Sequence, residues 1–176
     1  MMRSIGSSHG LKDQQKDDVN RYAGTSFKYA QRFVVSEAVT RGWKIATCDI
    51  SKAFLQGVTY RELSELTGEP LREVNFTLPS ASNGTLRKVK GFETFNPYRE
   101  VLHCDKPGTG SVDAPRCFLL NLSKVTNDVC GMRPSSIDQE LCMQHVERGG
   151  TQVLLALLTK HVDDIKITGG VDTSVS

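Results

Sequence analysis

The sequence predicts an α+β domain in which an antiparallel sheet carries helices packed on one face. Two segments, residues 27–41 and 115–129, repeat apolar residues at helical spacing. Runs of β-forming residues separated by turn signals occupy most of the last third of the chain. Strands and helices do not alternate strictly, which disfavours a parallel sheet. With 176 residues, the chain has the length of one domain.

The two helices are delimited by the residues that flank them. The first begins near Phe27 and is ended by Gly42, and Pro115 favours the start of the second, which Gly131 ends. Their apolar positions are Phe27, Ala30, Val34 and Ala38 in the first helix, and Phe118, Leu122, Val125 and Val129 in the second.

The strands are predicted from short β-forming runs bounded by Gly, Pro, Asn or Asp. A hairpin turn is expected at Gly149-Gly150, and an acidic turn follows the strand that comes after it. Residues 57–71 are charged and rich in turn formers, so they are expected to be irregular. The predicted strands are residues 43–50, 73–78, 100–104, 140–145, 151–161 and 165–168.

The ends and the composition set further expectations. Residues 1–25 are polar and aperiodic, which predicts a disordered leader before a domain at 26–170 and a tail at 171–176. A net charge of +2 is too small to indicate a polyanionic partner. Five cysteines without a C-x-x-C pair favour an intracellular protein, cytoplasmic or nuclear and not secreted. The apolar run 153–158 is too short to span a membrane, so no membrane partner is expected.

Two acidic sites lie where predicted strands end. Asp49 closes the run before Ile50, and Asp163-Asp164 stand between the last two strands. If these strands are neighbours, their carboxylates converge and repel one another unless cations lie between them, and Mg²⁺ prefers such oxygen ligands. The alternatives are a plain hairpin turn at Asp163-Asp164 and a helix N-cap at Asp49 for residues 51–55.

Three segments, taken in order, resemble a known family. The run Asp49-Ile50-Ser51-Lys52-Ala53-Phe54-Leu55-Gln56-Gly57 resembles the first catalytic motif of copia-type reverse transcriptases. Residues 106–116, which end in Ala-Pro-Arg, are similar to the family's Gly-x-x-x-Ala-Pro-Arg segment. His161-Val162-Asp163-Asp164 resembles its aromatic-x-Asp-Asp box, with His in place of the usual Tyr. The resemblance covers residues 27–168, and most of residues 59–71 is unmatched, as in an insertion.

The resemblance implies a truncated reverse transcriptase palm with incomplete fingers and no thumb, acting as an RNA-directed DNA polymerase. A primer 3′-hydroxyl attacks the α-phosphate of a deoxynucleotide, and two Mg²⁺ or Mn²⁺ ions assist. By position, Asp49 and Asp163 bridge both ions, the carbonyl of Ile50 completes one coordination sphere, and Asp164 is a weaker ligand. The implied partners are an RNA or DNA template with its primer, deoxynucleoside triphosphates, and the remaining polyprotein with ribonuclease H and integrase.

The resemblance also implies nucleotide contacts. Phe54 falls at the family's aromatic steric gate, and Gly110, Asp113 and Arg116 lie in the segment that contacts the nucleotide. Asp113 replaces the usual Gln, and its charge would repel a triphosphate unless a metal ion or Arg116 offsets it. From the residues alone, an ordinary core position is the simpler interpretation of Phe54. For Arg116, a solvated helix position is an equal alternative. The one compact basic cluster, Arg87, Lys88 and Lys90, is expected to be a solvated loop.

Two other functions remain open. A catalytically inactive remnant of a retroelement polyprotein, with at most weak nucleic-acid binding, has the same fold without the activity. A two-metal nuclease or phosphatase also uses converging carboxylates. The second fits less well, because such hydrolases commonly add His ligands or a general base, and the sequence shows no motif for either.

Overall fold

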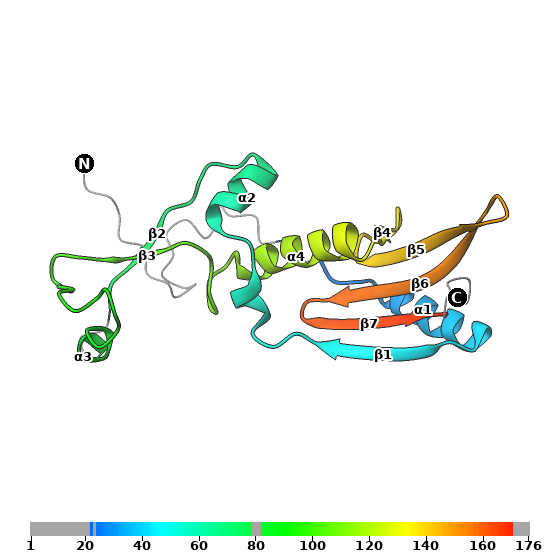
Figure 1. The fold of residues 1–176 in the computed structure, drawn as a ribbon, viewed down its shortest axis with the longest axis horizontal. Coiled ribbons are helices and arrows are strands. Elements are labelled where there is room, and N and C mark those ends of the chain that lie inside the picture. Colours follow the sequence, from blue (N-terminus) through cyan, green and yellow to red (C-terminus); the bar gives the residue numbers. More distant parts are fainter. Residues whose placement is uncertain (1–21, 23, 79–81, 171–176) are drawn as a thin grey trace.

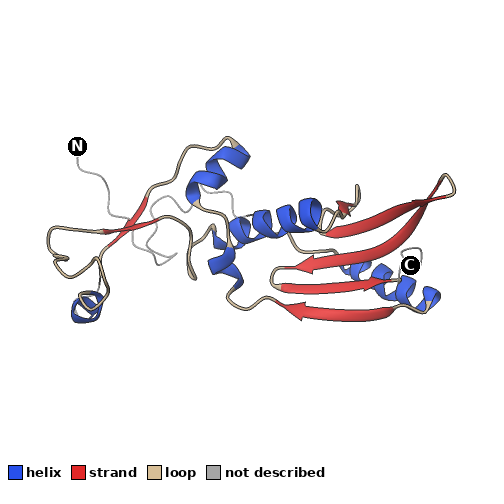
Figure 2. Cartoon of the chain, in the orientation of Figure 1, coloured by secondary structure: helices blue, strands red, loops and turns tan. Residues whose placement is uncertain are grey.

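The computed structural model describes residues 22, 24–78 and 82–170, and its main feature is a five-stranded sheet (Figures 1 and 2). Each pair of neighbouring strands is antiparallel. The spatial order is β1 (Lys44–Asp49), β7 (Asp164–Gly169), β6 (Thr151–His161), β5 (Leu141–Arg148) and β4 (Arg133–Pro134). The predicted α+β class with an antiparallel sheet is therefore confirmed.

The molecule is elongated, with a small ribbon at the opposite end from the sheet (Figure 1). The ribbon pairs β2 (Val74–Phe76) with β3 (Leu102–Cys104), and α3 (Asn83–Leu86) lies beside it. Between the two ends lie η1 (Ala53–Gln56), α2 (Tyr60–Thr67), α4 (Ala114–Lys124) and the π-helical turn η3 (Val125–Val129) that continues α4.

Helix α1 (Lys28–Arg41) forms where the apolar spacing predicts it. Ala30 and Val34 are buried against Leu141 and Leu157 of the sheet. Gly42 ends the helix with φ 67°, a left-handed conformation that glycine adopts without steric cost. In Figure 1 this helix lies behind the sheet.

The opposite face of the sheet is covered in part by α4. Phe118 and Leu122 of this helix pack with Ala53 and reach Ile165 of β7. The prediction of helices on one face is therefore wrong. The apolar run of β6 sends successive side chains to opposite faces, and both Leu157 and Leu158 are buried, so both faces need cover.

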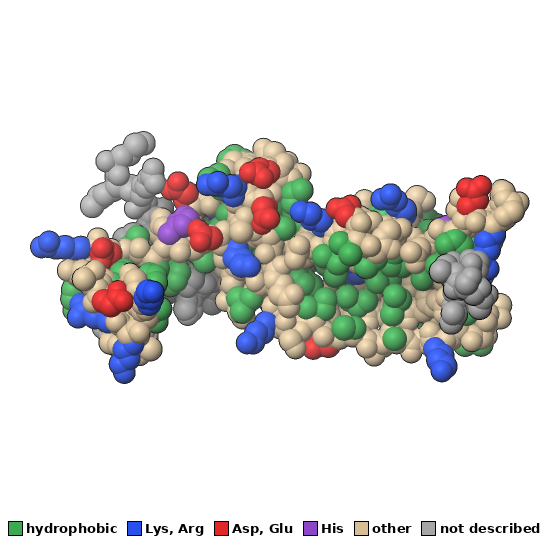
Figure 3. Space-filling model, viewed as in Figure 1, with side chains coloured by type: hydrophobic (Ala, Val, Ile, Leu, Met, Phe, Trp, Pro, Cys, Tyr) green, Lys and Arg blue, Asp and Glu red, His purple; other side chains and the backbone are tan. Residues whose placement is uncertain are grey.

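Beside α4, this face stays open. Figure 3 shows hydrophobic side chains gathered over the sheet next to the helix. Ile167, the register partner of Leu158 on this face, is 37% exposed. The cover that α4 gives is thus confined to one end of the strands.

The segment expected to be irregular contains α2. Its start is a capping box, in which the Glu62 amide donates to Thr59 Oγ1 (3.2 Å) and the Thr59 amide donates to Glu62 Oε2 (2.7 Å). Tyr60 and Leu63 then pack against Cys117 of α4. The prediction for residues 57–71 is wrong because the charged residues masked this local helix signal.

Most of the predicted leader, and the tail 171–176, lie outside the described residues. The last leader residues do contact the domain, since Gly24 is buried and Thr25 forms a β-bridge with His161. The Ser26 amide then donates to the Lys160 carbonyl (2.9 Å). Within the described part of the chain, no helix combines the length and the apolar character needed to cross a membrane.

Candidate functional site

The two acidic sites meet at one end of the sheet. Asp49, the last residue of β1, is the register partner of Asp164, the first residue of β7. The next backbone contact joins the same segments, because the Ile50 amide donates to the Asp163 carbonyl (3.1 Å). Residues directly opposite in an antiparallel pair project from the same face of the sheet. The strands that carry the acidic residues are therefore neighbours, as the convergence of their carboxylates requires.

These carboxylates have no partner among the described residues. Asp49 and Asp164 are exposed and Asp163 is half-buried, and none of the three side chains makes a hydrogen bond or ion pair with another described residue. Like charges that lie directly opposite across two strands are destabilising. The pair Asp49 and Asp164 thus carries an electrostatic cost that no hydrogen bond or ion pair with a described residue offsets.

A divalent cation completed by substrate fits this pair. Mg²⁺ is commonly held by one or two carboxylates together with substrate phosphates and water, and less often by a cage of protein ligands. Asp49 and Asp164 supply two such carboxylates on one face. The residues that the structure describes contain no group of three or more His, Cys, Asp or Glu that could hold a metal ion by itself. The roles expected for Asp163 and for the Ile50 carbonyl stay predictions.

The hairpin beside the acidic pair is strained. His161 and Asp164 are register partners, so Val162 and Asp163 form the turn between β6 and β7. Val162 has φ 58°, which is unfavourable for a β-branched residue. Lys52, three residues after Asp49, also has a positive φ of 54°. Backbone strain of this kind gathers at functional sites, where the surrounding structure maintains it.

The two structural alternatives for the acidic residues have different outcomes. Asp163 does lie in a hairpin turn, as the turn alternative expected. Asp49 is not a helix cap, because η1 begins only at Ala53, after Lys52, and has no side-chain cap. The position of Asp49 at the end of β1 is therefore left without a local structural role.

A pocket of about 430 Å³ lies beside Asp164. It is lined by Gln31 of α1 and by residues of β1, β6 and β7, namely Thr47, Thr159, His161, Asp164, Ile165 and Lys166. Sequence reasoning did not single out Gln31, Thr47, Thr159 or Lys166. No local motif marks them, because they come together only through the pairing of three strands and the packing of α1 against them.

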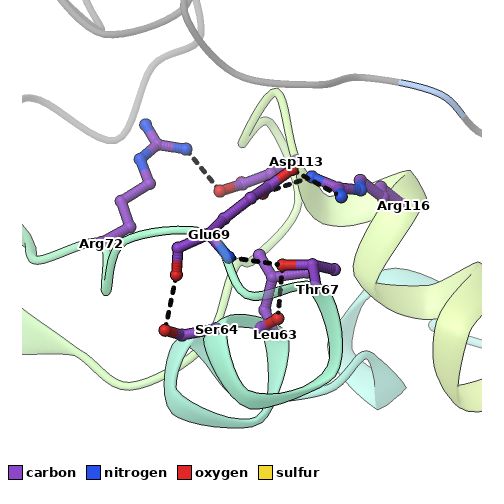
Figure 4. Close-up of polar contacts among 7 residues, drawn as sticks. All are labelled: Leu63, Ser64, Thr67, Glu69, Arg72, Asp113 and Arg116. Carbon is purple, nitrogen blue, oxygen red and sulfur yellow. Dashed lines mark hydrogen bonds and ion pairs between the residues drawn. The ribbon is translucent and has the colours of Figure 1, made fainter.

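Two expected nucleotide contacts are engaged elsewhere, in a polar network between α2 and α4 (Figure 4). Asp113 is fully buried and forms an ion pair with Arg72. Arg116 donates two hydrogen bonds to Glu69, at 2.8 and 2.9 Å. Arg72 therefore makes the ion pair with Asp113, and Arg116, which is held by Glu69, is not a solvated helix residue.

The ionisation of this network follows from its contacts. The hydrogen bond from Arg116 lowers the pKa of the Glu69 carboxyl, and the same bond raises the pKa of Arg116. Burial raises the pKa of the Tyr60 hydroxyl, with Asp113 adding to the effect, and burial raises the pKa of the Cys117 thiol to about 12. Tyr60 and Cys117 are therefore neutral near pH 7 and pack between α2 and α4.

The remaining candidates lie in ordinary structural positions. Phe54 packs against the cluster of Ala53, Phe118 and Leu122, as the core alternative expected, and its role as a steric gate stays a prediction. Gly110 has φ 93° in the loop before α4, a conformation that requires glycine. The basic cluster Arg87, Lys88 and Lys90 is exposed, in agreement with the solvated-loop interpretation.

No protein-family model matches the chain, no curated protein matches its sequence, and no solved structure matches its fold. The functional argument therefore depends on the geometry of the acidic pair and on the three sequence segments.

Proposed function

We propose that the chain is the palm-centred part of a copia-type reverse transcriptase and adds deoxynucleotides to a primer by two-metal nucleotidyl transfer. The observation that carries the proposal is the register pairing of Asp49 with Asp164, two exposed carboxylates without a cationic partner among the described residues. The strained turn at Val162, beside Asp163, supports it. The order of the three motif segments supports it independently.

In this reaction Asp49, Asp163 and Asp164 would bind the ions, and the pairing of β1 with β7 would position these residues. Asp49 and Asp163 are assigned by their motifs and Asp164 by its register with Asp49. Two divalent ions held by Asp49, Asp163 and Asp164 would supply a lowered pKa of the primer 3′-hydroxyl and a positive charge beside the leaving pyrophosphate. The hydrogen bond from the Ile50 amide to the Asp163 carbonyl keeps the two acidic segments at a constant separation. Template and primer are bound through their phosphates and the shape of the hybrid duplex.

A primer-extension assay on an RNA template, with Mg²⁺ or Mn²⁺, tests the proposal. The intact chain is expected to incorporate deoxynucleotides, and Asp49→Asn is expected to lose about 100-fold or more of that rate, because ion binding contributes several kcal/mol to transition-state stabilisation. Asp128→Asn is the matched control. It removes the same charge from an exposed residue of η3, and its rate is expected to equal that of the intact chain.

Two other outcomes favour the alternatives. If a folded, intact chain incorporates nothing with either ion, the inactive remnant is the correct interpretation. If the chain cleaves single-stranded nucleic acid in an Asp49-dependent manner without adding nucleotides, the site belongs to a two-metal nuclease.

A further inference from the structure

Two cross-strand rows lie next to each other on the face of the sheet that α1 covers. The first row is Asp49, Asp164 and His161, which are register partners across β1, β7 and β6. The second row is Thr47, Lys166 and Thr159, aligned across the same three strands. The rows are two residues apart along each strand, so they share a face and are separated by about 7 Å.

The central residue of the second row is an uncompensated cation. Lys166 is half-buried and makes no hydrogen bond or ion pair with another described residue. The threonines on its two sides differ in exposure, because Thr159 is only 3% exposed whereas Thr47 lies on the edge strand and is exposed. An ammonium group between two hydroxyl groups can offer three kinds of contact to one anion, because Lys donates only and each hydroxyl can rotate to donate.

Lys166, Thr47 and Thr159 line one pocket of the protein. Gln31 of α1 lines the same pocket of about 430 Å³. Its carboxamide Nε2 donates to the Ser26 carbonyl (3.4 Å) and to Ser26 Oγ (3.2 Å), so Gln31 bounds the pocket without adding a free donor. A volume of this size suits a small molecule.

We propose that Lys166, with Thr47 and Thr159, binds the polyphosphate tail of the incoming deoxynucleoside triphosphate. This inference rests on the proposed function, because it takes the acidic row as the site of the divalent ions. Lys166 acts as a point charge on the phosphates, and the hydroxyl groups of the two threonines orient them.

The charge of the site explains why a polyphosphate fits better than another anion. The carboxylates of Asp49 and Asp164 repel any anion that arrives without cations. A polyphosphate brings divalent ions with it, and these ions are held by the carboxylates on one side and by the phosphates on the other. Once three carboxylates surround two divalent ions, a triphosphate still carries excess negative charge, which Lys166 reduces.

The kinetic test compares Lys166→Gln and Lys166→Arg with the intact chain. Lys166→Gln is expected to raise the KM for deoxynucleotides about tenfold and to change kcat by less than about threefold, since it removes binding that the ground state and transition state share. Lys166→Arg keeps the charge and is expected to restore most of the affinity. Lys44→Gln is the matched control, because Lys44 lies at the other end of the same strand pair.

A binding experiment separates this inference from the proposed function. Inorganic tripolyphosphate is titrated calorimetrically into each protein in the presence of Mg²⁺. Binding by the intact chain that Lys166→Gln weakens about tenfold, and Lys44→Gln leaves unchanged, supports the site. If the same result is obtained with a chain that adds no nucleotides, the proposed polymerase fails and the polyphosphate site stands.

Other outcomes overturn the inference. If the chain adds nucleotides while Lys166→Gln changes neither the KM for deoxynucleotides nor the affinity for tripolyphosphate, the triphosphate binds elsewhere on the protein. If Lys166→Gln instead weakens the binding of primer and template and reduces the salt dependence of that binding, Lys166 contacts the nucleic-acid backbone.

Discussion

The carboxylates of the protein occupy two contrasting environments, one exposed and without a partner in the described part of the chain, the other buried or paired with arginine. At the sheet end, Asp49 and Asp164 are exposed, lie opposite each other, and have no partner among the described residues. Between α2 and α4, Asp113 is fully buried against Arg72, and Glu69 accepts two hydrogen bonds from Arg116.

The difference separates buried carboxylates that depend on a partner from exposed carboxylates that are available to a ligand. A desolvated charge is tolerated only with a partner, so the pairing of Asp113 is a condition of folding. A solvated carboxylate can stay unpaired at a small cost, and two of them in register add a repulsion that a bound cation would relieve. Asp113, the residue that departs from the reverse-transcriptase motif that its segment resembles, therefore belongs to the first class.

The largest change in the free energy of unfolding is expected at the buried ion pair of Arg72 and Asp113. Arg72→Met leaves the Asp113 carboxylate buried without its cation, which is expected to lower the free energy of unfolding by about 3–5 kcal/mol. Urea denaturation measures the change. The control is Arg61→Met, which removes an exposed arginine of α2 and is expected to cost less than about 0.5 kcal/mol. A loss below about 1 kcal/mol for Arg72→Met would mean that Asp113 is solvated in the folded protein.

A smaller change, an increase in the free energy of unfolding, is expected at the strained hairpin between β6 and β7. Val162→Gly removes the Cβ that makes φ 58° unfavourable, so the free energy of unfolding is expected to rise by about 1 kcal/mol. Val162→Ala keeps a Cβ and is expected to stabilise the protein much less. Both are compared by urea denaturation. Equal stability of the Gly and Ala variants contradicts the assignment of strain to this turn.

The smallest effect is expected at the acidic pair itself. Without divalent ions, Asp164→Asn removes the repulsion from Asp49 and is expected to raise the free energy of unfolding by about 0.2–1 kcal/mol. Mg²⁺ is expected to raise the thermal unfolding midpoint of the intact chain and of Asp128→Asn, but not of Asp164→Asn. An equal response of all three proteins to Mg²⁺ excludes this pair as the ion site.

Local signals predicted much of the sheet and of α1. The Gly149-Gly150 turn determines where β5 ends and β6 begins, and both glycines have the positive φ that such a hairpin requires. The run 151–161 was predicted with the bounds that β6 has. Helix α2 also had a local signal, the capping box of Thr59 and Glu62, which the charged composition of the segment obscured.

Motif order selected Asp49 and Asp163-Asp164, and the structure adds that their strands are neighbours. The cation beside them was not predictable. Lys166 stands in an ordinary β-forming run, and only the register of β7 with β1 and β6 places it between Thr47 and Thr159. Register is set by strand pairing over the whole sheet, and a slip of one residue would turn Lys166 to the other face.

By itself, the sequence determined the short-range features: the start and end of α1, the β5–β6 hairpin, and two acidic sites at the ends of apolar runs. These depend on glycine, on spacing, and on residues close together in the chain. Only the tertiary structure decided that both faces of the sheet carry a helix, that Arg72 neutralises Asp113, and that Lys166 lies next to the acidic row. Each of these joins segments far apart in the chain, and their contact depends on the packing of the whole molecule.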